Sequence, residues 1–186
     1  MKQSGPSKRV FVGIKATDRV SDECIKLQAG LSNLPVGLTH PEDLHLTLLP
    51  PWQMEDQLLT EKKLLKAVRS IESFTLEFKT LAFGPDNNRP RLVWITGKAT
   101  NEINRLKQAL EDVLGIETRL PVLPHITIAR FARKDQARLA CQTLKQPISL
   151  SMPVTSVELF ESAKSNGNAY RVLLSLPLLP SPDNGW

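Results

Sequence analysis

PEDLHLTL (residues 41–48) and PVLPHITI (residues 121–128) decide the fold, because the second stretch repeats the pattern of the first. In each, a proline lies four residues before a histidine, a threonine lies two residues after it, and an aliphatic residue follows each of the two. Such alternation is typical of a β-strand, in which residues i and i+2 point to one face. Each stretch is therefore predicted to be a strand with a histidine–threonine face and an aliphatic face that anchors the core.

The segments around these stretches are predicted to follow the same order in both halves of the chain. Apolar periodicity predicts strand, helix, strand, helix, strand in the first half, over residues 9–15, 18–29, 44–49, 58–71 and 74–83. The second half repeats this order and adds a final strand, over residues 91–96, 101–114, 125–129, 134–144, 148–160 and 169–176. The prolines at positions 50 and 51, followed by Trp52, are expected to end the second strand.

Aromatic residues support an internal duplication. Phe11 and Trp94, each in the first strand of its half, precede His45 and His125 by similar distances along the chain. The expected fold is α+β, with two lobes related by a pseudo-twofold axis and antiparallel sheets around a central cleft. One histidine–threonine motif comes from each lobe.

Length and composition fit one soluble domain. The 186 residues are 41% hydrophobic, which is enough to bury a sizeable core. We expect a single two-lobed domain over residues 1–186, with repeats of about 9–84 and 91–178 and a disordered tail at 1–8. No apolar run is long enough to span a bilayer, and the N-terminal residues lack the apolar core of a signal peptide, so we expect a cytoplasmic location. The net charge of +5 suits a phosphate-bearing partner without requiring one.

Two histidines on facing strands can perform acid–base chemistry. Histidine changes charge near neutral pH, so one of a pair can act as a base while the other acts as an acid. Hydrolysis of a phosphodiester needs both roles, and threonine hydroxyls can donate to the phosphate oxygens on which charge builds. The alternative is that both histidines are structural and bind only to the backbone. The repetition of the motif at His45 and His125 makes that alternative much the weaker.

The chain resembles the 2H phosphoesterase superfamily, which is named for two His-x-Thr-x motifs. Within it, the chain is most similar to the RNA 2′,3′-cyclic phosphodiesterases, historically called 2′-5′ RNA ligases. The resemblance covers nearly the whole chain and rests on these segments in this order: RVFVGIK at 9–15, DLHLTL at 43–48, RLVWIT at 91–96, PHITIAR at 124–130, VTSVELFES at 154–162 and AYRVLLSLPL at 169–178.

The resemblance implies a role for each motif residue. His45 would donate a proton to the leaving 3′ oxygen, His125 would accept a proton from water, and Thr47 and Thr127 would hold the phosphate. The product would be a 2′-phosphate. From the residues alone the two motifs are nearly symmetric and leave open which histidine is the acid. The chain departs from the family after the first motif, where LPPW at residues 49–52 replaces a Phe-Leu-Gly-like stretch.

Three further residues are candidates at the edge of the site. Arg130 would either bind the phosphate or lie in solvent, because strict alternation turns it away from His125 unless the strand bulges or ends. Trp52 would stack on a base or pack under a loop. Tyr170 aligns with an aromatic near the family's site, and core packing is the alternative. His40 is expected to be a loop histidine outside the site.

The resulting prediction is an enzyme that needs no metal or cofactor. Its partners would be RNA ends or nucleotides that carry a 2′,3′-cyclic phosphate, and it would be a monomer without membrane contact. Two alternatives remain open. The same histidines could run the reaction backwards and join RNA ends through a 2′-5′ linkage, or the chain could bind RNA ends or nucleotides without turnover.

Overall fold

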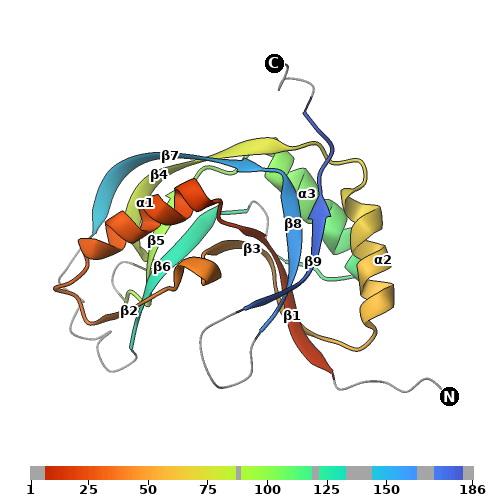
Figure 1. Ribbon diagram of the computed structural model, residues 1–186, viewed down its shortest axis with the longest axis horizontal. Coiled ribbons are helices and arrows are strands. Elements are labelled where there is room, and N and C mark those ends of the chain that lie inside the picture. Colours follow the sequence, from red (N-terminus) through yellow and green to blue (C-terminus); the bar gives the residue numbers. More distant parts are fainter. Residues whose placement is uncertain (1–6, 87–88, 119–121, 133–143, 163–169, 182–186) are drawn as a thin grey trace.

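The computed structural model describes residues 7–86, 89–118, 122–132, 144–162 and 170–181 (Figure 1). Within them lie two antiparallel sheets and three α-helices, which confirms the predicted α+β class. The four-stranded sheet has the order β3 (His45–Met54), β1 (Lys8–Lys15), β8 (Ser156–Glu161), β9 (Arg171–Pro177). The five-stranded sheet has the order β2 (Val36–Leu38), β6 (His125–Phe131), β5 (Leu92–Gly97), β4 (Phe74–Gly84), β7 (Lys145–Val154).

Both halves of the chain contribute strands to both sheets. Each histidine strand pairs with the first strand of its own half, β3 with β1 and β6 with β5. On its other side that first strand pairs with a strand from the opposite half, β1 with β8 and β5 with β4. The order β3-β1-β8-β9 therefore has its counterpart in β6-β5-β4-β7, with β2 added beyond β6. The exact limits of the two predicted repeats stay a prediction.

A helix also connects the two sheets (Figure 1). Helix α1 (Asp18–Ala29) follows β1 of the four-stranded sheet but packs against β6 and β7 of the other sheet. Its Gln28 is buried and donates from Nε2 to the carbonyl oxygens of Thr39 at 2.7 Å and Ile128 at 2.9 Å. Helices α2 (Gln57–Val68) and α3 (Asn101–Leu114) pack on each other, with α2 against β9 and α3 against β3. No helix in the described part of the chain is long and apolar enough to cross a membrane.

The aliphatic faces of the motif strands lie in the core, as predicted. Leu46, Leu48, Ile126 and Ile128 are all buried. Cys24 is also buried, which raises the pKa of its thiol to about 12 and leaves it unreactive. Cys141 lies outside the described residues.

A β-bulge follows the threonine of the first motif. On β1, Gly13 faces Thr47 and the neighbouring Val12 faces Leu49. Leu48 is therefore an extra residue on β3, and both Leu48 and Leu49 are buried. Two consecutive residues on the core side reset the alternation of the strand.

The second motif carries the same bulge. Trp94 on β5 faces Thr127, and the neighbouring Val93 faces Ala129, so Ile128 is the extra residue on β6. Ile128 and Ala129 are both buried. The residue after each bulge, Pro50 in one strand and Arg130 in the other, is consequently exposed on the histidine–threonine side.

Several predicted boundaries were wrong, among them the following three. Strand β3 continues through the two prolines to Met54, because β3 is the edge of its sheet and a second register shift, opposite Phe11, interrupts its pairing with β1 at the prolines. The predicted strand at 148–160 is two strands, since the chain passes at Thr155 from β7 in one sheet to β8 in the other. Lys8, assigned to the tail, begins β1. The helix predicted at 134–144 falls outside the described residues except for Leu144, which precedes β7.

Close packing around Gly13 makes the first sheet sensitive to a single methyl group. A Cβ at Gly13 would lie 2.6 Å from the carbonyl oxygen of Leu46 and 3.3 Å from the ring of Phe160. We expect Gly13→Ala to lower the free energy of unfolding by about 1–3 kcal/mol, because neither the backbone nor the buried ring can move freely. Chemical denaturation measures this change. Gly30→Ala is the control, since its Cβ meets only the Leu27 carbonyl at 3.4 Å, and it should leave stability unchanged or raise it by up to about 1 kcal/mol. Equal stability of the two variants would contradict the prediction.

Candidate active site

Each motif histidine is held by a hydrogen bond of the same kind. His45 and His125 are the first residues of β3 and β6, and each places Nδ1 next to the carbonyl oxygen two residues earlier. The distances are 2.6 Å to Asp43 and 2.9 Å to Leu123. A carbonyl oxygen only accepts, so Nδ1–H is the donor in both. Each Nε2 is therefore left to accept a proton when the ring is neutral and to donate one when it is charged.

Aromatic rings orient both imidazoles. The His45 ring lies 4.9 Å from Phe11, 5.5 Å from Phe160 and 5.0 Å from Tyr170, measured between centroids. The His125 ring lies 4.7 Å from Trp94. Contacts of this kind each contribute about 0.5–1.5 kcal/mol beyond the area they bury, so the rings restrict how the imidazoles can turn.

The aromatic residues that suggested a duplication do contact their histidines, but from positions that are not equivalent. Trp94 is the residue paired with Thr127. The residue paired with Thr47 is Gly13, two positions after Phe11. The strands and the motifs therefore correspond between the two halves, whereas Phe11 and Trp94 do not occupy corresponding positions.

Charged groups of the second motif act on the histidine of the first. Burial lowers the pKa of His45 and of His125 below the ordinary value, and the hydrogen bond from each Nδ1 to its carbonyl acts in the opposite direction. The positive charge of Arg130 lowers both pKa values further. Asp43 raises and His125 lowers the pKa of His45. Since strands β3 and β6 are in contact, the structure brings the two histidines and Arg130 into one site.

The threonines and Arg130 lie on the same side as the histidines. Thr47 and Thr127 are half-buried, two residues along their strands from His45 and His125. Arg130 reaches this side because the bulge at Ile128 shifts the alternation by one residue. The sequence predicted that Arg130 could reach the site only if the strand bulged or ended before it, and the strand does bulge.

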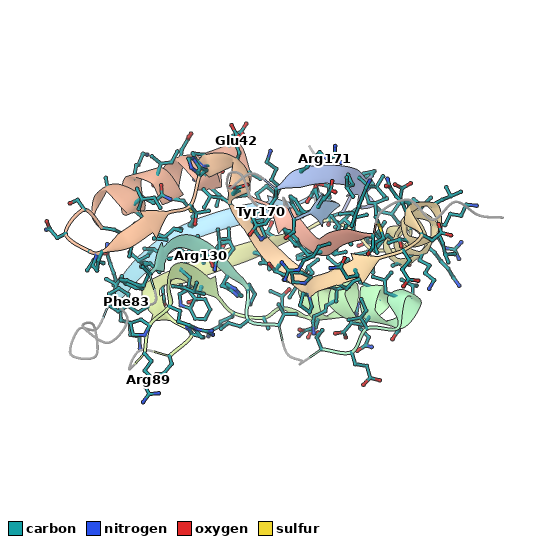
Figure 2. The ribbon with its side chains drawn as sticks, turned by 90° about the horizontal axis from the view of Figure 1, so that it is seen from below. Glu42, Phe83, Arg89, Arg130, Tyr170 and Arg171 are labelled. Carbon is teal, nitrogen blue, oxygen red and sulfur yellow. The ribbon has the colours of Figure 1, made fainter. Side chains whose placement is uncertain are left out.

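The two aromatic candidates lie in different places. Tyr170 stands edge-on to His45, with an interplanar angle of 87°, and it lies near the middle of the view with Arg130 (Figure 2). Trp52 is paired with the buried Val10 and packs against the hydrophobic core, so its side chain is on the face away from the histidines. The packing alternative applies to Trp52. His40 is exposed and precedes the short 3₁₀ helix η1 (Pro41–Asp43).

Sequence reasoning missed Asp43 and Phe160. Asp43 supplies the carbonyl that holds His45, and its side chain is buried. Its place two residues before His45 was the only signal, and a charged residue in that position ordinarily indicates a solvated turn. Within the described residues, no three His, Cys, Asp or Glu side chains lie close enough to hold a metal ion.

Comparison with known families and proteins finds relatives of this chain. The family model described as the 2′-5′ RNA ligase superfamily matches residues 26–166. The RNA 2′,3′-cyclic phosphodiesterase of Methanocaldococcus jannaschii is 26% identical over 132 residues, which cover 70% of this chain and 75% of that protein. The protein of the same name from Archaeoglobus fulgidus is 26% identical over 131 residues, covering 68% of this chain and 74% of that protein.

Solved structures show the same fold. The crystal structure of TT0787 of Thermus thermophilus has a TM-score of 0.73 at 23% identity, covering 91% of this chain and 97% of that one. The crystal structure of E. coli LigT complexed with 3′-AMP has a TM-score of 0.72 at 21% identity, covering 92% of this chain and 98% of that one.

Neutralising Arg130 should change the titration of both histidines. Arg130→Gln removes a positive charge that disfavours the imidazolium, so the pKa of His45 and of His125 should rise. Titration of the ring protons by NMR measures both values. Arg89→Gln is the control, because this exposed arginine is not among the charges that act on either histidine. A pKa that stays unchanged or falls at both histidines in Arg130→Gln would contradict the assigned geometry.

Proposed function

The chain belongs to the 2′-5′ RNA ligase superfamily, and we propose that it hydrolyses 2′,3′-cyclic phosphates at RNA ends or on nucleotides to 2′-phosphomonoesters. One observation carries the proposal. His45 and His125 come from paired motifs, each has Nδ1 tied to the backbone, and each keeps Nε2 for proton transfer. The curated relatives named RNA 2′,3′-cyclic phosphodiesterase support the same substrate class.

In the proposed reaction the two histidines begin in opposite protonation states. Neutral His125 takes a proton from water as the water oxygen bonds to phosphorus. The bond from phosphorus to O3′ breaks, its electron pair stays on O3′, and His45 supplies the proton that makes the 3′-hydroxyl. The phosphate remains on O2′. Exchange with solvent then restores both histidines.

The surroundings of the histidines support this division of roles. Asp43 lies beside His45 and favours its charged form, as suits the acid. No carboxylate acts in this way on His125 among the described residues. Thr47, Thr127 and Arg130 would donate to the non-bridging oxygens, where a preorganised donor stabilises the transition state more than the ground state.

The reverse reaction would use the same groups. An RNA 5′-hydroxyl in place of water would give a 2′-5′ linkage, and the name of the superfamily refers to that activity. Because water is the more abundant nucleophile, hydrolysis is the proposed direction. A turnover assay also separates either reaction from binding without chemistry. The cytoplasmic location and the monomeric state stay predictions from the sequence.

Removing either histidine should abolish most of the turnover. We expect His45→Ala and His125→Ala each to lower kcat by about 10²–10⁴-fold, the range for a lost general acid or base. The double variant should be little worse than either single one, because the pair acts as a unit. Hydrolysis of a nucleoside 2′,3′-cyclic phosphate, followed by ³¹P NMR, measures the rate and identifies the 2′-phosphate. A folded single variant with nearly normal turnover would refute the mechanism.

The threonines should matter and His40 should not. Thr47→Val and Thr127→Val keep shape and strand preference but lose a donor, so each should lower kcat by about 10–1,000-fold. His40→Asn is the control and should stay within a few-fold of normal. All three variants are assayed with and without excess EDTA, which should leave the rates unchanged. Activity that EDTA abolishes and added metal restores, or a His40 variant as impaired as His45→Ala, would overturn the metal-independent two-histidine mechanism.

A further inference from the structure

Asp43 is connected to His45 directly and through Tyr170. It ends the 3₁₀ helix η1 just before strand β3, and only 5% of its surface is exposed. Its backbone carbonyl accepts the hydrogen bond from His45 Nδ1 at 2.6 Å. Its carboxylate Oδ1 accepts a hydrogen bond from the backbone N–H of Tyr170 at 2.7 Å. Burying a carboxylate is costly unless it is hydrogen-bonded, and this bond to a distant segment meets part of that requirement.

Tyr170 connects the carboxylate back to the histidine. Its ring stands edge-on to His45 at 5.0 Å and edge-on to Phe11 at 5.0 Å. The backbone bond to Asp43 fixes where strand β9 begins, and thereby fixes where this ring lies. Asp43 thus provides the hydrogen-bond partner of His45 Nδ1 and also holds Tyr170, an aromatic neighbour of His45, in place.

The second motif forms without such a carboxylate. The residue that corresponds to Asp43 is Leu123, whose carbonyl accepts the bond from His125 Nδ1 while its side chain is 53% exposed. The motif therefore does not need a buried acid in order to fold. The Asp43 carboxylate is a feature of His45 alone.

We propose that Asp43 is a positioning residue for His45, acting through the bond from its carboxylate to the Tyr170 N–H. This inference rests on the proposed hydrolysis and deepens it. The carboxylate locks the ring of Tyr170 against the imidazole and holds η1 in place, so that Nε2 of His45 is aimed at the leaving oxygen. Small displacements of Nε2 from this position lower the rate of proton transfer strongly.

Other charged groups also surround His45. Arg130 and His125 act from β6, and Lys15 is the residue paired with His45 on β1, with its side chain exposed. Among the described residues, the Asp43 carboxylate is the negative charge that opposes them, and it raises the pKa of His45. Charge and geometry can be separated, because asparagine keeps an oxygen that accepts the Tyr170 N–H but has no charge.

The experiment compares Asp43→Ala and Asp43→Asn with Glu42→Gln. Glu42 is exposed on the same turn, points away at the rim of the view, and is the control that should behave as wild type (Figure 2). Asp43→Ala should lower kcat by about 10–100-fold with KM changed by less than about threefold, since positioning acts on the chemical step. Asp43→Asn should recover most of kcat. By NMR, the pKa of His45 should fall in Asp43→Asn, because a negative charge is lost, while that of His125 should not change.

The outcomes distinguish this inference from the proposed function. If His45→Ala destroys turnover while a folded Asp43→Ala enzyme keeps normal kcat, the positioning role is wrong and the hydrolysis stands. If His45→Ala retains turnover, the proposed mechanism itself fails. Should Asp43→Ala not fold, Asp43→Ser takes its place, because its shorter side chain does not reach the Tyr170 N–H: a loss of kcat that Asp43→Asn does not share supports the role, and normal kcat in a folded Asp43→Ser enzyme overturns it.

Discussion

The hydrogen bond from each histidine Nδ1 to a carbonyl two residues earlier is the constraint on which the site depends. A half-buried imidazole needs a partner for its N–H, and at the first residue of a strand the carbonyl of the preceding turn is close enough to provide it. The bond gives each ring one tautomer and one direction. Proton transfer at Nε2 depends on this bond, because it keeps a proton on Nδ1 and leaves Nε2 as the atom that accepts or donates the transferred proton.

Exchange of strands between the two halves keeps the pair of rings together. The first strand of each half pairs on one side with its own histidine strand and on the other with a strand from the opposite half. Neither sheet can therefore form from one half alone. Helix α1, from the first half, packs against strands of the second half. Its Gln28 donates a hydrogen bond to the carbonyl of Ile128, which lies inside the second motif. Separating the motifs would break sheet hydrogen bonds as well as side-chain packing.

What could be predicted from the sequence was mostly what is local. The motif strands, their aliphatic buried faces and the helix at Asn101–Leu114 follow from period and capping. The position of a strand within its sheet is not local, and the passage of β3 through Pro50 depends on β3 being an edge. Strict alternation turned Arg130 away from the site, and the single extra residue of the bulge in β6 turned it back. Asp43 was missed for a related reason, since its partner, the N–H of Tyr170, lies 127 residues away.

Arg130 and Asp43 also break the symmetry of the scaffold. After matching bulges, the first motif presents Pro50 where the second presents Arg130. Before the histidines, the first motif has the buried Asp43 where the second has the exposed Leu123. A symmetric pair of histidines would have no reason to divide the roles of acid and base. Here one motif adds a negative charge beside its own histidine, and the other adds a positive charge that acts on both. The two halves thus provide two imidazoles held in the same way, and a few different residues beside them give each a different chemical environment.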